Sequence, residues 1–289
     1  MNGILNIFKP TGMTSFDVVR IIKKITHIKK VGHAGTLDPE ASGVLPVCIG
    51  KATKAIDYIM GDFKIYETEL KLGIITDTYD REGKILAESE VKASCEEIIQ
   101  AINSFVGEIK QVPPMYSALK VNGKKLYELA RAGIEIEREA RPITIYDIEI
   151  TDIKIPYVKF RVKCSKGTYI RSLCYDIGEL LECGGMMWNL QRTATGQFHI
   201  EDAINILDLN EENINGHIMP IETIFKNNTK IVIEDRFVKF LLNGVVVKDR
   251  ALICKFEEDI MYSIYNKDND FIGIADKSNE GVRLIKSFI

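Results

Sequence analysis

The segment from Gly32 to Gly43 constrains the fold more than any other part of the sequence. Its three glycines allow positive φ angles and a close approach of the backbone to another group. Pro39 favours an extended conformation for Asp38 and cannot continue a helix. The segment is therefore predicted to be a loop that presents one carboxylate from a defined backbone position.

Apolar segments flank this loop on both sides. A helix is predicted over residues 15–28, with Thr14 or Ser15 as its N-cap, and residues 44–50 have the continuous apolar character of a buried strand. Catalytic groups often lie on glycine-rich loops between packed elements, but Asp before Pro is also an ordinary turn residue. Spacing alone leaves both roles open for Asp38.

The pattern up to residue 200 mixes further strands and helices. Strands are predicted over 66–72, 143–150, 157–164 and 188–198, and helices over 94–105 and 167–181. Arg171 falls in the first turn of the last helix, the unfavourable end of the helix dipole for a cation, so a carboxylate partner is expected. Tyr66 begins its strand, near an edge, and on this pattern alone strand-end packing is its favoured role.

After residue 229 the pattern changes to short strands with one short helix. Five or six short apolar segments within roughly sixty residues are typical of a small barrel. Two domains are therefore expected, over 1–225 and 229–289. Residues 201–225 hold six acids and no Lys or Arg, and they are predicted to form a linker or an irregular edge.

Positive charge is segregated along the chain, although the net charge is −3. Residues 1–30 hold six Lys or Arg against one Asp, and residues 154–171 hold six with no acid. Such clusters can form basic faces that bind polyanions, although solvated faces are the alternative for any single cluster.

Residues 110–141 combine turn residues with basic and aromatic side chains. Pro113-Pro114 interrupts the pattern, and Asn122-Gly123 predicts a hairpin turn. The interleaved side chains are Lys120, Lys124, Lys125, Arg131, Arg138 and Arg141 with Tyr116 and Tyr127. This mixture suits contacts to an RNA backbone and stacking on bases, while a surface excursion packed by its own side chains is the alternative.

Cysteine usage and hydropathy indicate the compartment. The six cysteines show no C-x-x-C pair and no His at ligand spacing, so neither a metal site nor disulfides are expected. No apolar segment is long enough to span a bilayer, and the N-terminus lacks a secretory signal. A cytoplasmic protein without membrane contact is predicted.

Several motifs occur together in a fixed order. They are Lys9-Pro10-x-Gly12-x-Thr14-Ser15, the Gly32–Gly43 loop with Gly-Thr-Leu-Asp-Pro, the Tyr66 strand, Pro114-Met115-Tyr116-Ser117-Ala118-Leu119-Lys120, Arg141-Pro142-Ile143, and Ser165-Lys166-Gly167-Thr168-Tyr169-Ile170-Arg171. Together they resemble the TruB family of bacterial pseudouridine synthases, which isomerise uridine 55 in the T-arm of tRNA. The resemblance implies an α+β fold with a mixed, mainly antiparallel sheet flanked by helices. The C-terminal part is similar to a PUA RNA-binding domain.

The resemblance also implies roles for individual residues. Asp38 corresponds to the essential nucleophile or base, Arg171 to its charge partner, and Tyr66 to the tyrosine that stacks on the target base. Further contacts to the RNA are implied for His33, Gly35, Thr36, Leu37, Lys9, Pro10, Tyr169, Lys124 and Lys125. The target uridine must be flipped out of the folded arm, and residues 110–141 resemble the thumb that closes over the T-loop.

The same resemblance implies a monomer that uses no cofactor, metal, guide RNA or protein partner. Three alternatives differ from it. A glycoside hydrolase would need a pair of carboxylates at a set separation, and Glu40 is the only other acid on the loop. A non-catalytic tRNA-binding protein would not need Asp38, Tyr66 and Arg171 together. The insert at 110–141 disfavours a guide-RNA-dependent relative of archaeal type.

Overall fold

The computed structural model describes residues 1–61, 63–117, 119–121 and 123–289. The side chains of Lys120 and Lys125 are also outside this description. The described part therefore leaves out Ala118 of the 114–120 motif, Asn122 of the predicted hairpin turn, and the predicted roles of the Lys120 and Lys125 side chains.

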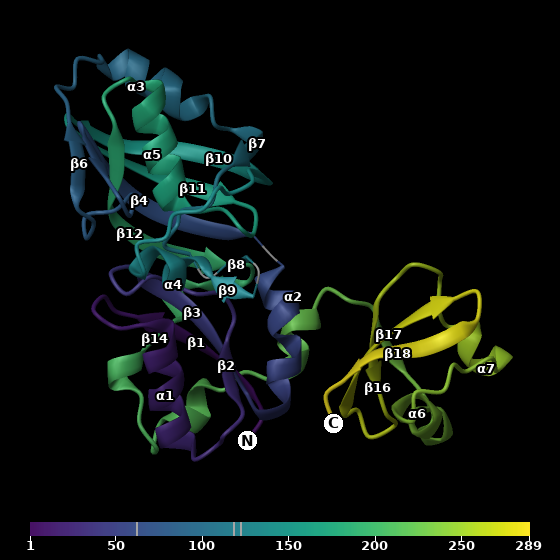
Figure 1. Cartoon of the computed structure of the whole chain (residues 1–289). Coiled ribbons are helices and arrows are strands. Elements are labelled where there is room, and N and C mark those ends of the chain that lie inside the picture. Colours follow the sequence, from purple (N-terminus) through teal and green to yellow (C-terminus); the bar gives the residue numbers. More distant parts are fainter. Residues whose placement is uncertain (62, 118, 122) are drawn as a thin grey trace.

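The described residues form a mixed sheet of ten strands that carries the first two thirds of the chain (Figure 1). Its order is β14-β1-β3-β12-β4-β11-β10-β7, with β2 added to β3 and β13 added to β12. The strands are β1 (Gly3–Lys9), β2 (Val31–His33), β3 (Ser42–Ile49), β4 (Lys64–Leu72), β7 (Gly107–Gln111), β10 (Arg141–Lys154), β11 (Tyr157–Cys164), β12 (Gly185–Thr195), β13 (Phe198–His199) and β14 (Ile204–Asn205). Among the described strand pairs of this sheet, only β1–β14 and β3–β12 are parallel. The mixed, mainly antiparallel sheet is confirmed.

A narrow seam divides this sheet into two halves. Strands β3 and β12 pair through two residue pairs only, Gln191 with Ser42 and Arg192 with Gly43. By contrast, β12 and β4 pair from Gly185 opposite Leu72 to Thr195 opposite Lys64. Figure 1 shows the halves as two lobes, with β1–β3 in one and β4, β10, β11 and β12 in the other. The loop between β2 and β3, which carries Asp38, therefore begins and ends beside the seam.

The helices cover the sheet with their apolar faces. They are α1 (Ser15–Thr26), α2 (Ile56–Met60) after the 3₁₀ turn η1 (Gly50–Ala55), α3 (Cys95–Asn103), α4 (Leu126–Arg131) and α5 (Ile170–Leu180). The predicted caps are present: Thr14 and Asp17 form a capping box at α1, and Ser94 and Glu97 form one at α3. In the described part of the chain, no helix combines the length and apolarity that crossing a membrane requires.

Two smaller hairpins extend from the main sheet. Strands β5 (Ile74–Thr76) and β6 (Ile85–Glu88) form one, and β8 (Lys120–Val121) and β9 (Lys124–Lys125) form the other. The second belongs to the insert of residues 112–140, which also contains α4 and places Met115 and Leu126 in buried positions. Arg138 donates to the carbonyl of Pro113 at 3.0 Å, which ties the two ends of the insert together.

The C-terminal part has its own four-stranded sheet in the order β15-β16-β17-β18. Its elements are β15 (Lys230–Val232), α6 (Asp235–Leu242), α7 (Arg250–Ile253), β16 (Tyr262–Tyr265), β17 (Phe271–Ser278) and β18 (Gly281–Ser287). An isolated bridge between Val247 and Val282 extends it, but the ladder does not close into a barrel among the described residues. One of the short apolar segments predicted as strands after residue 229 lies at 251–256, and that prediction is wrong. Asp249 caps a helical turn there by accepting from the N–H of Ala251.

The acidic segment 201–225 is an irregular edge of the main sheet, and the linker alternative is wrong. It follows η2 (Ile200–Asp202) and contains β14 and the turns η3 (Ile206–Asp208), η4 (Ile214–His217) and η5 (Ile221–Phe225). Ile206, Leu209 and Ile214 are buried in the main core, while the intervening acids Asp208, Glu211 and Glu212 stay exposed. Isolated apolar residues spaced between acids are enough to bind the segment to the sheet.

A shared apolar cluster joins the C-terminal sheet to the main sheet. Ile274 and Phe288 lie in the same buried cluster as Ile4 and Val44 of the main sheet. The ring of Phe225 lies 5.6 Å from that of Phe288, measured between centroids. This continuity means that the two parts stabilise each other through buried apolar area.

We expect Phe288→Ala to lower the free energy of unfolding by roughly 3–5 kcal/mol, the usual cost of emptying a buried phenylalanine site. Phe288 is 4% exposed. Urea denaturation measures the change, and Phe240→Ala is the matched control because Phe240 is 51% exposed. Equal effects of the two substitutions would contradict the shared core.

Candidate active site

The loop of Asp38 is fixed by hydrogen bonds to its backbone. The N–H of Leu37 donates to Ser15 Oγ at 2.9 Å, and the Ser15 hydroxyl donates to the carbonyl of Leu37 at 3.1 Å. The N–H of Gly12 donates to the carbonyl of Pro39 at 2.9 Å. The two residues on either side of Asp38 are therefore held by the segment that begins α1, so the direction of the carboxylate is defined.

Arg171 grips the Asp38 carboxylate with two nitrogens. Its Nε lies 3.1 Å from Oδ2, and its Nη2 lies 3.4 Å from Oδ1. The guanidinium is 6% exposed, whereas the Asp38 side chain is 38% exposed. A two-pronged contact of this kind fixes orientation as well as charge. The carboxylate is thus open to a substrate on one side and supported on the other.

Further acceptors surround the Arg171 guanidinium. Nη1 lies 3.6 Å from the carboxylate of Asp80, and Nη2 donates to the carbonyl of Tyr116 at 2.7 Å. A carboxylate partner was expected for Arg171 because it lies in the first turn of a helix. The structure gives it two, Asp38 and Asp80. Tyr116 belongs to the insert and Asp80 to the turn between β5 and β6, so Arg171 links three separate segments at the seam.

Lys9 supports the loop from inside the protein. Its side chain is fully buried, and Nζ donates to the carbonyls of Pro10, Met13 and Pro39. Desolvation by burial lowers the pKa of Lys9 to about 8, although the charges of Asp38 and Glu40 oppose this. The structure therefore places Lys9 behind the Asp38 loop, and Pro10 beside it.

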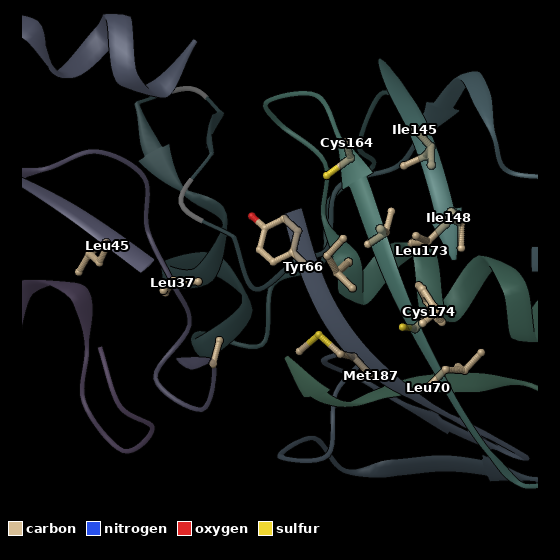
Figure 2. Close-up of a cluster of buried hydrophobic side chains, with 14 of the residues drawn as sticks. Leu37, Leu45, Tyr66, Leu70, Ile145, Ile148, Cys164, Leu173, Cys174 and Met187 are labelled. Atoms are coloured by element: carbon tan, nitrogen blue, oxygen red, sulfur yellow. The ribbon is translucent and has the colours of Figure 1, made fainter. Parts of the chain in front are cut away.

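Tyr66 lies in the interior of the sheet, and its predicted place near a sheet edge is wrong. Strand β4 pairs with β11 on one side and with β12 on the other, opposite Val162 and Arg192 respectively. In Figure 2 the ring lies between Leu37 and the group that contains Leu173, with its hydroxyl directed away from that group. Tyr66 is 8% exposed, and burial raises the pKa of its phenol.

Two other predicted residues lie at the ends of elements beside the loop. His33 ends β2, and its Nδ1 is buried without a hydrogen-bond partner in the described part of the chain. Burial, and then the charge of Arg192, lower the pKa of His33. Tyr169 is the N-cap residue of α5, and its N–H donates to Gln111 Oε1 at 2.8 Å.

The remaining predicted contacts differ in their exposure. Thr36 is exposed on the loop, Gly35 is half-buried with φ of +100°, and Leu37 is buried. Lys124 is exposed on β9, away from the loop in sequence. Among the described residues no three His, Cys, Asp or Glu side chains are grouped as a metal site would need.

Three charged residues of the site were not predicted from the sequence. Asp80 and Arg81 lie in a turn, where polar residues are ordinary, so nothing marked them. Arg81 donates to Glu40 at 3.1 Å, which ties the other acid of the loop to that turn. Arg192 could have been found from the sequence. If the side chains of the strand alternate and Ala194 faces inward, Arg192 faces inward as well, which is unusual for a charged residue.

Family models match most of the chain. The model described as TruB family pseudouridylate synthase (N terminal domain) matches residues 23–170. The model described as tRNA pseudouridylate synthase B C-terminal domain matches residues 171–226. The second match thus covers α5, β12 and the acidic edge, and the sheet β15–β18 lies beyond it.

Whole proteins and solved structures resemble the chain along its length. A protein of Clostridium novyi (strain NT) named tRNA pseudouridine synthase B is 59% identical over 286 residues, which is 99% of each chain. A crystal structure of a Cbf5-Nop10-Gar1 complex has a TM-score of 0.73 at 29% identity, over 99% of this chain and 85% of that one. An H/ACA RNP bound to a substrate RNA containing 2′-deoxyuridine has a TM-score of 0.71 at 27% identity, with coverage of 99% and 85%.

The burial of Lys9 predicts a pH-dependent stability. Its folded-state pKa of about 8 lies below the ordinary value of 10.5, so the unfolded chain binds the proton more strongly between these values. The free energy of unfolding of the wild type should therefore rise, relative to Lys9→Met, as the pH increases from 8 to 10.5. Urea denaturation across this range measures the difference.

The exposed Lys51 provides the control. The difference between the wild type and Lys51→Met should not change with pH over the same range. A constant difference for Lys9→Met as well would mean that the Lys9 ammonium is not desolvated in the folded protein.

Proposed function

The chain belongs to the TruB family of pseudouridylate synthases, and from this premise we propose that it isomerises uridine 55 in the T-arm of tRNA to pseudouridine. Pseudouridylation of tRNA is the activity that the family and the names of its relatives support. The proposal includes three finer statements: the position in the tRNA, the catalytic role of Asp38, and a reaction that needs no cofactor and no other macromolecule.

One observation carries this proposal. The Asp38 carboxylate is half-exposed beside the seam of the sheet and is held by Arg171 at 3.1 and 3.4 Å. Because two nitrogens of a covered guanidinium fix the carboxylate, one face of it is available to a ribose. The same arrangement is unsuited to a glycoside hydrolase, since Glu40 is bonded to Arg81 and offers no free acid on the loop.

The chemistry balances without any added reactant. The N1–C1′ bond of uridine breaks, the base turns, and C5 of the same base bonds to C1′. The hydrogen on C5 is lost as a proton and N1 gains one, so nothing is oxidised or reduced. Asp38 acts at the sugar as nucleophile or base, and Arg171 stabilises the carboxylate in the steps in which it is charged.

Residues near Asp38 supply the other contacts that the target nucleotide needs. Tyr66 offers its ring to the flipped base, and its phenol is close enough to Asp38 for that charge to raise its pKa further. Thr36 lies on the loop, and His33 and Tyr169 lie on the segments beside it, where the RNA backbone must pass. Flipping is needed because a base within a folded arm cannot reach Asp38.

The insert of residues 112–140 is proposed to hold the T-arm. It contacts the site directly, because the carbonyl of Tyr116 accepts from Arg171. Its exposed Lys124 and Arg131 can reach phosphates, and Arg131 lies over the ring of Tyr127. An insert that belongs to the chain itself supports recognition of tRNA without a guide RNA.

The domain division over 1–225 and 229–289 remains part of the proposal, with the second part as a PUA-like RNA-binding unit. Its own apolar cluster supports this, since Phe237, Leu252 and Ile264 are buried within it. The shared cluster at Phe225 and Phe288 implies that it has a fixed position relative to the site.

The purified chain should form pseudouridine at position 55 of an unmodified tRNA transcript, with no other protein or RNA present. Carbodiimide adduct mapping by primer extension locates the product. A transcript with cytidine at position 55 is the control and should give no stop there. Modification only after a cell extract is added would contradict the unaided reaction, and a stop at another uridine would contradict the assigned position.

A further inference from the structure

Arg192 occupies an unusual place for a charged residue. It lies on β12 at the seam, where its backbone is paired with Tyr66 of β4 on one side and with Gly43 of β3 on the other. The residue is 1% exposed and is among the largest fully buried side chains. Burial of a guanidinium is costly, so its position indicates a specific role.

The guanidinium holds the backbone of the Asp38 loop. Nε donates to the carbonyl of Val44 at 2.8 Å, Nη2 to that of Gly35 at 3.1 Å, and Nη1 to that of Thr36 at 3.5 Å. Gly35 and Thr36 come shortly before Asp38, and Val44 follows the loop on β3. One side chain therefore connects the two ends of the loop that carries the carboxylate.

The backbones of Gly43 and Arg192 lie too close together for a residue with a side chain to replace Gly43. A Cβ at Gly43 would lie 2.1 Å from the carbonyl oxygen of Arg192, and φ at Gly43 is +115°. The loop and β12 thus approach each other backbone to backbone at the position where Arg192 emerges. This close backbone contact fixes the position of the Arg192 backbone, from which the guanidinium extends to the carbonyls of the loop.

The other side of Arg192 faces the second predicted reactive group. Burial raises the pKa of the Tyr66 phenol, and the charge of Arg192 and its hydrogen bond to the phenol oppose that rise. Burial lowers the pKa of His33, and the charge of Arg192 lowers it further. The same guanidinium therefore lies beside Tyr66 and His33 while it holds the Asp38 loop.

We propose that Arg192 is a positioning residue, which holds the Asp38 loop against Tyr66 so that the carboxylate and the phenol keep a fixed separation around the target nucleotide. This inference rests on the proposed function. In the proposed reaction Arg192 contacts no reacting atom. Arg171 holds the Asp38 carboxylate, and Arg192 holds the backbone of the loop that carries this carboxylate.

The test compares Arg192→Lys and Arg192→Gln in the full-length chain. Lysine keeps the charge but cannot donate to three separate carbonyls from a planar group, and glutamine also removes the charge. Single-turnover release of tritium from C5-labelled uridine in tRNA measures chemistry, and filter binding of the same tRNA measures affinity. Arg161→Lys is the control, because Arg161 is exposed on β11, opposite Glu67 of β4 and Glu149 of β10.

Both Arg192 variants should lose about 10²-fold or more in single-turnover rate, the effect of a small misplacement of a reacting group. Their affinity for tRNA should stay within about threefold of the wild type, because phosphate contacts come from other residues. The pKa of His33, measured by NMR, should rise in Arg192→Gln and stay in place in Arg192→Lys, since only the first removes the charge. Arg161→Lys should leave the rate unchanged.

Three results would overturn the proposal. Near-wild-type rates in both variants would show that the loop keeps its place without the guanidinium, and a parallel loss of affinity would assign Arg192 to RNA binding. If Arg192→Lys does not fold, judged by thermal melting, then Arg192 is a determinant of the fold and not a positioning residue. A wild-type chain that releases no tritium from tRNA would instead contradict the proposed function, so the two failures are distinguishable.

Discussion

The ion pair between Asp38 and Arg171 is the interaction on which the rest of the site depends. A carboxylate on a glycine-rich loop would be mobile by itself, and a guanidinium in the first turn of α5 would oppose the helix dipole. Together they satisfy each other, with Nε 3.1 Å from Oδ2. The loop is supported from behind by Lys9, Ser15 and Arg192, so the flexibility of its glycines is used for close packing and not for motion. Preorganisation of this kind is what a reaction at a ribose carbon requires.

The architecture explains why these residues meet. The two halves of the main sheet are joined by only two residue pairs between β3 and β12, so side chains from both halves can reach the seam. Asp38 comes from the half with α1, Tyr66 and Arg192 from the half with α5, and Tyr116 from the insert. The C-terminal sheet packs on the first half through Phe288 and Ile274. It therefore stabilises the scaffold without contributing a described side chain to the Asp38–Arg171 contact.

Most elements with a clear period were predictable from the sequence, and most of the errors have a common cause. The helices α1 and α3 were identified because their caps and apolar spacing agree with each other, and α5 was identified from its apolar spacing. The helical turn α7 was mistaken for a strand, since a short apolar segment has no distinctive period. In the site, the loop geometry and the partner of Arg171 were predictable from local physics. Asp80 and Arg81 were not, and Arg192 was overlooked although the alternation of its strand marked it. Their partners lie more than 40 positions away in sequence, at Arg171, Glu40 and Gly35, and only the folded sheet brings them together.

The central claim is that the Asp38 carboxylate performs the chemistry, and one comparison tests it most directly. Tritium release from C5-labelled uridine in tRNA should fall below detection in Asp38→Asn, which keeps the shape of the side chain but removes its charge and its reactive oxygen. Filter binding of the same tRNA should survive, because phosphate contacts come from Lys and Arg residues. Glu40→Gln, on the same loop, should retain activity, since Glu40 contacts Arg81 and not Arg171. Tritium release by Asp38→Asn at a rate close to that of the wild type would contradict the account.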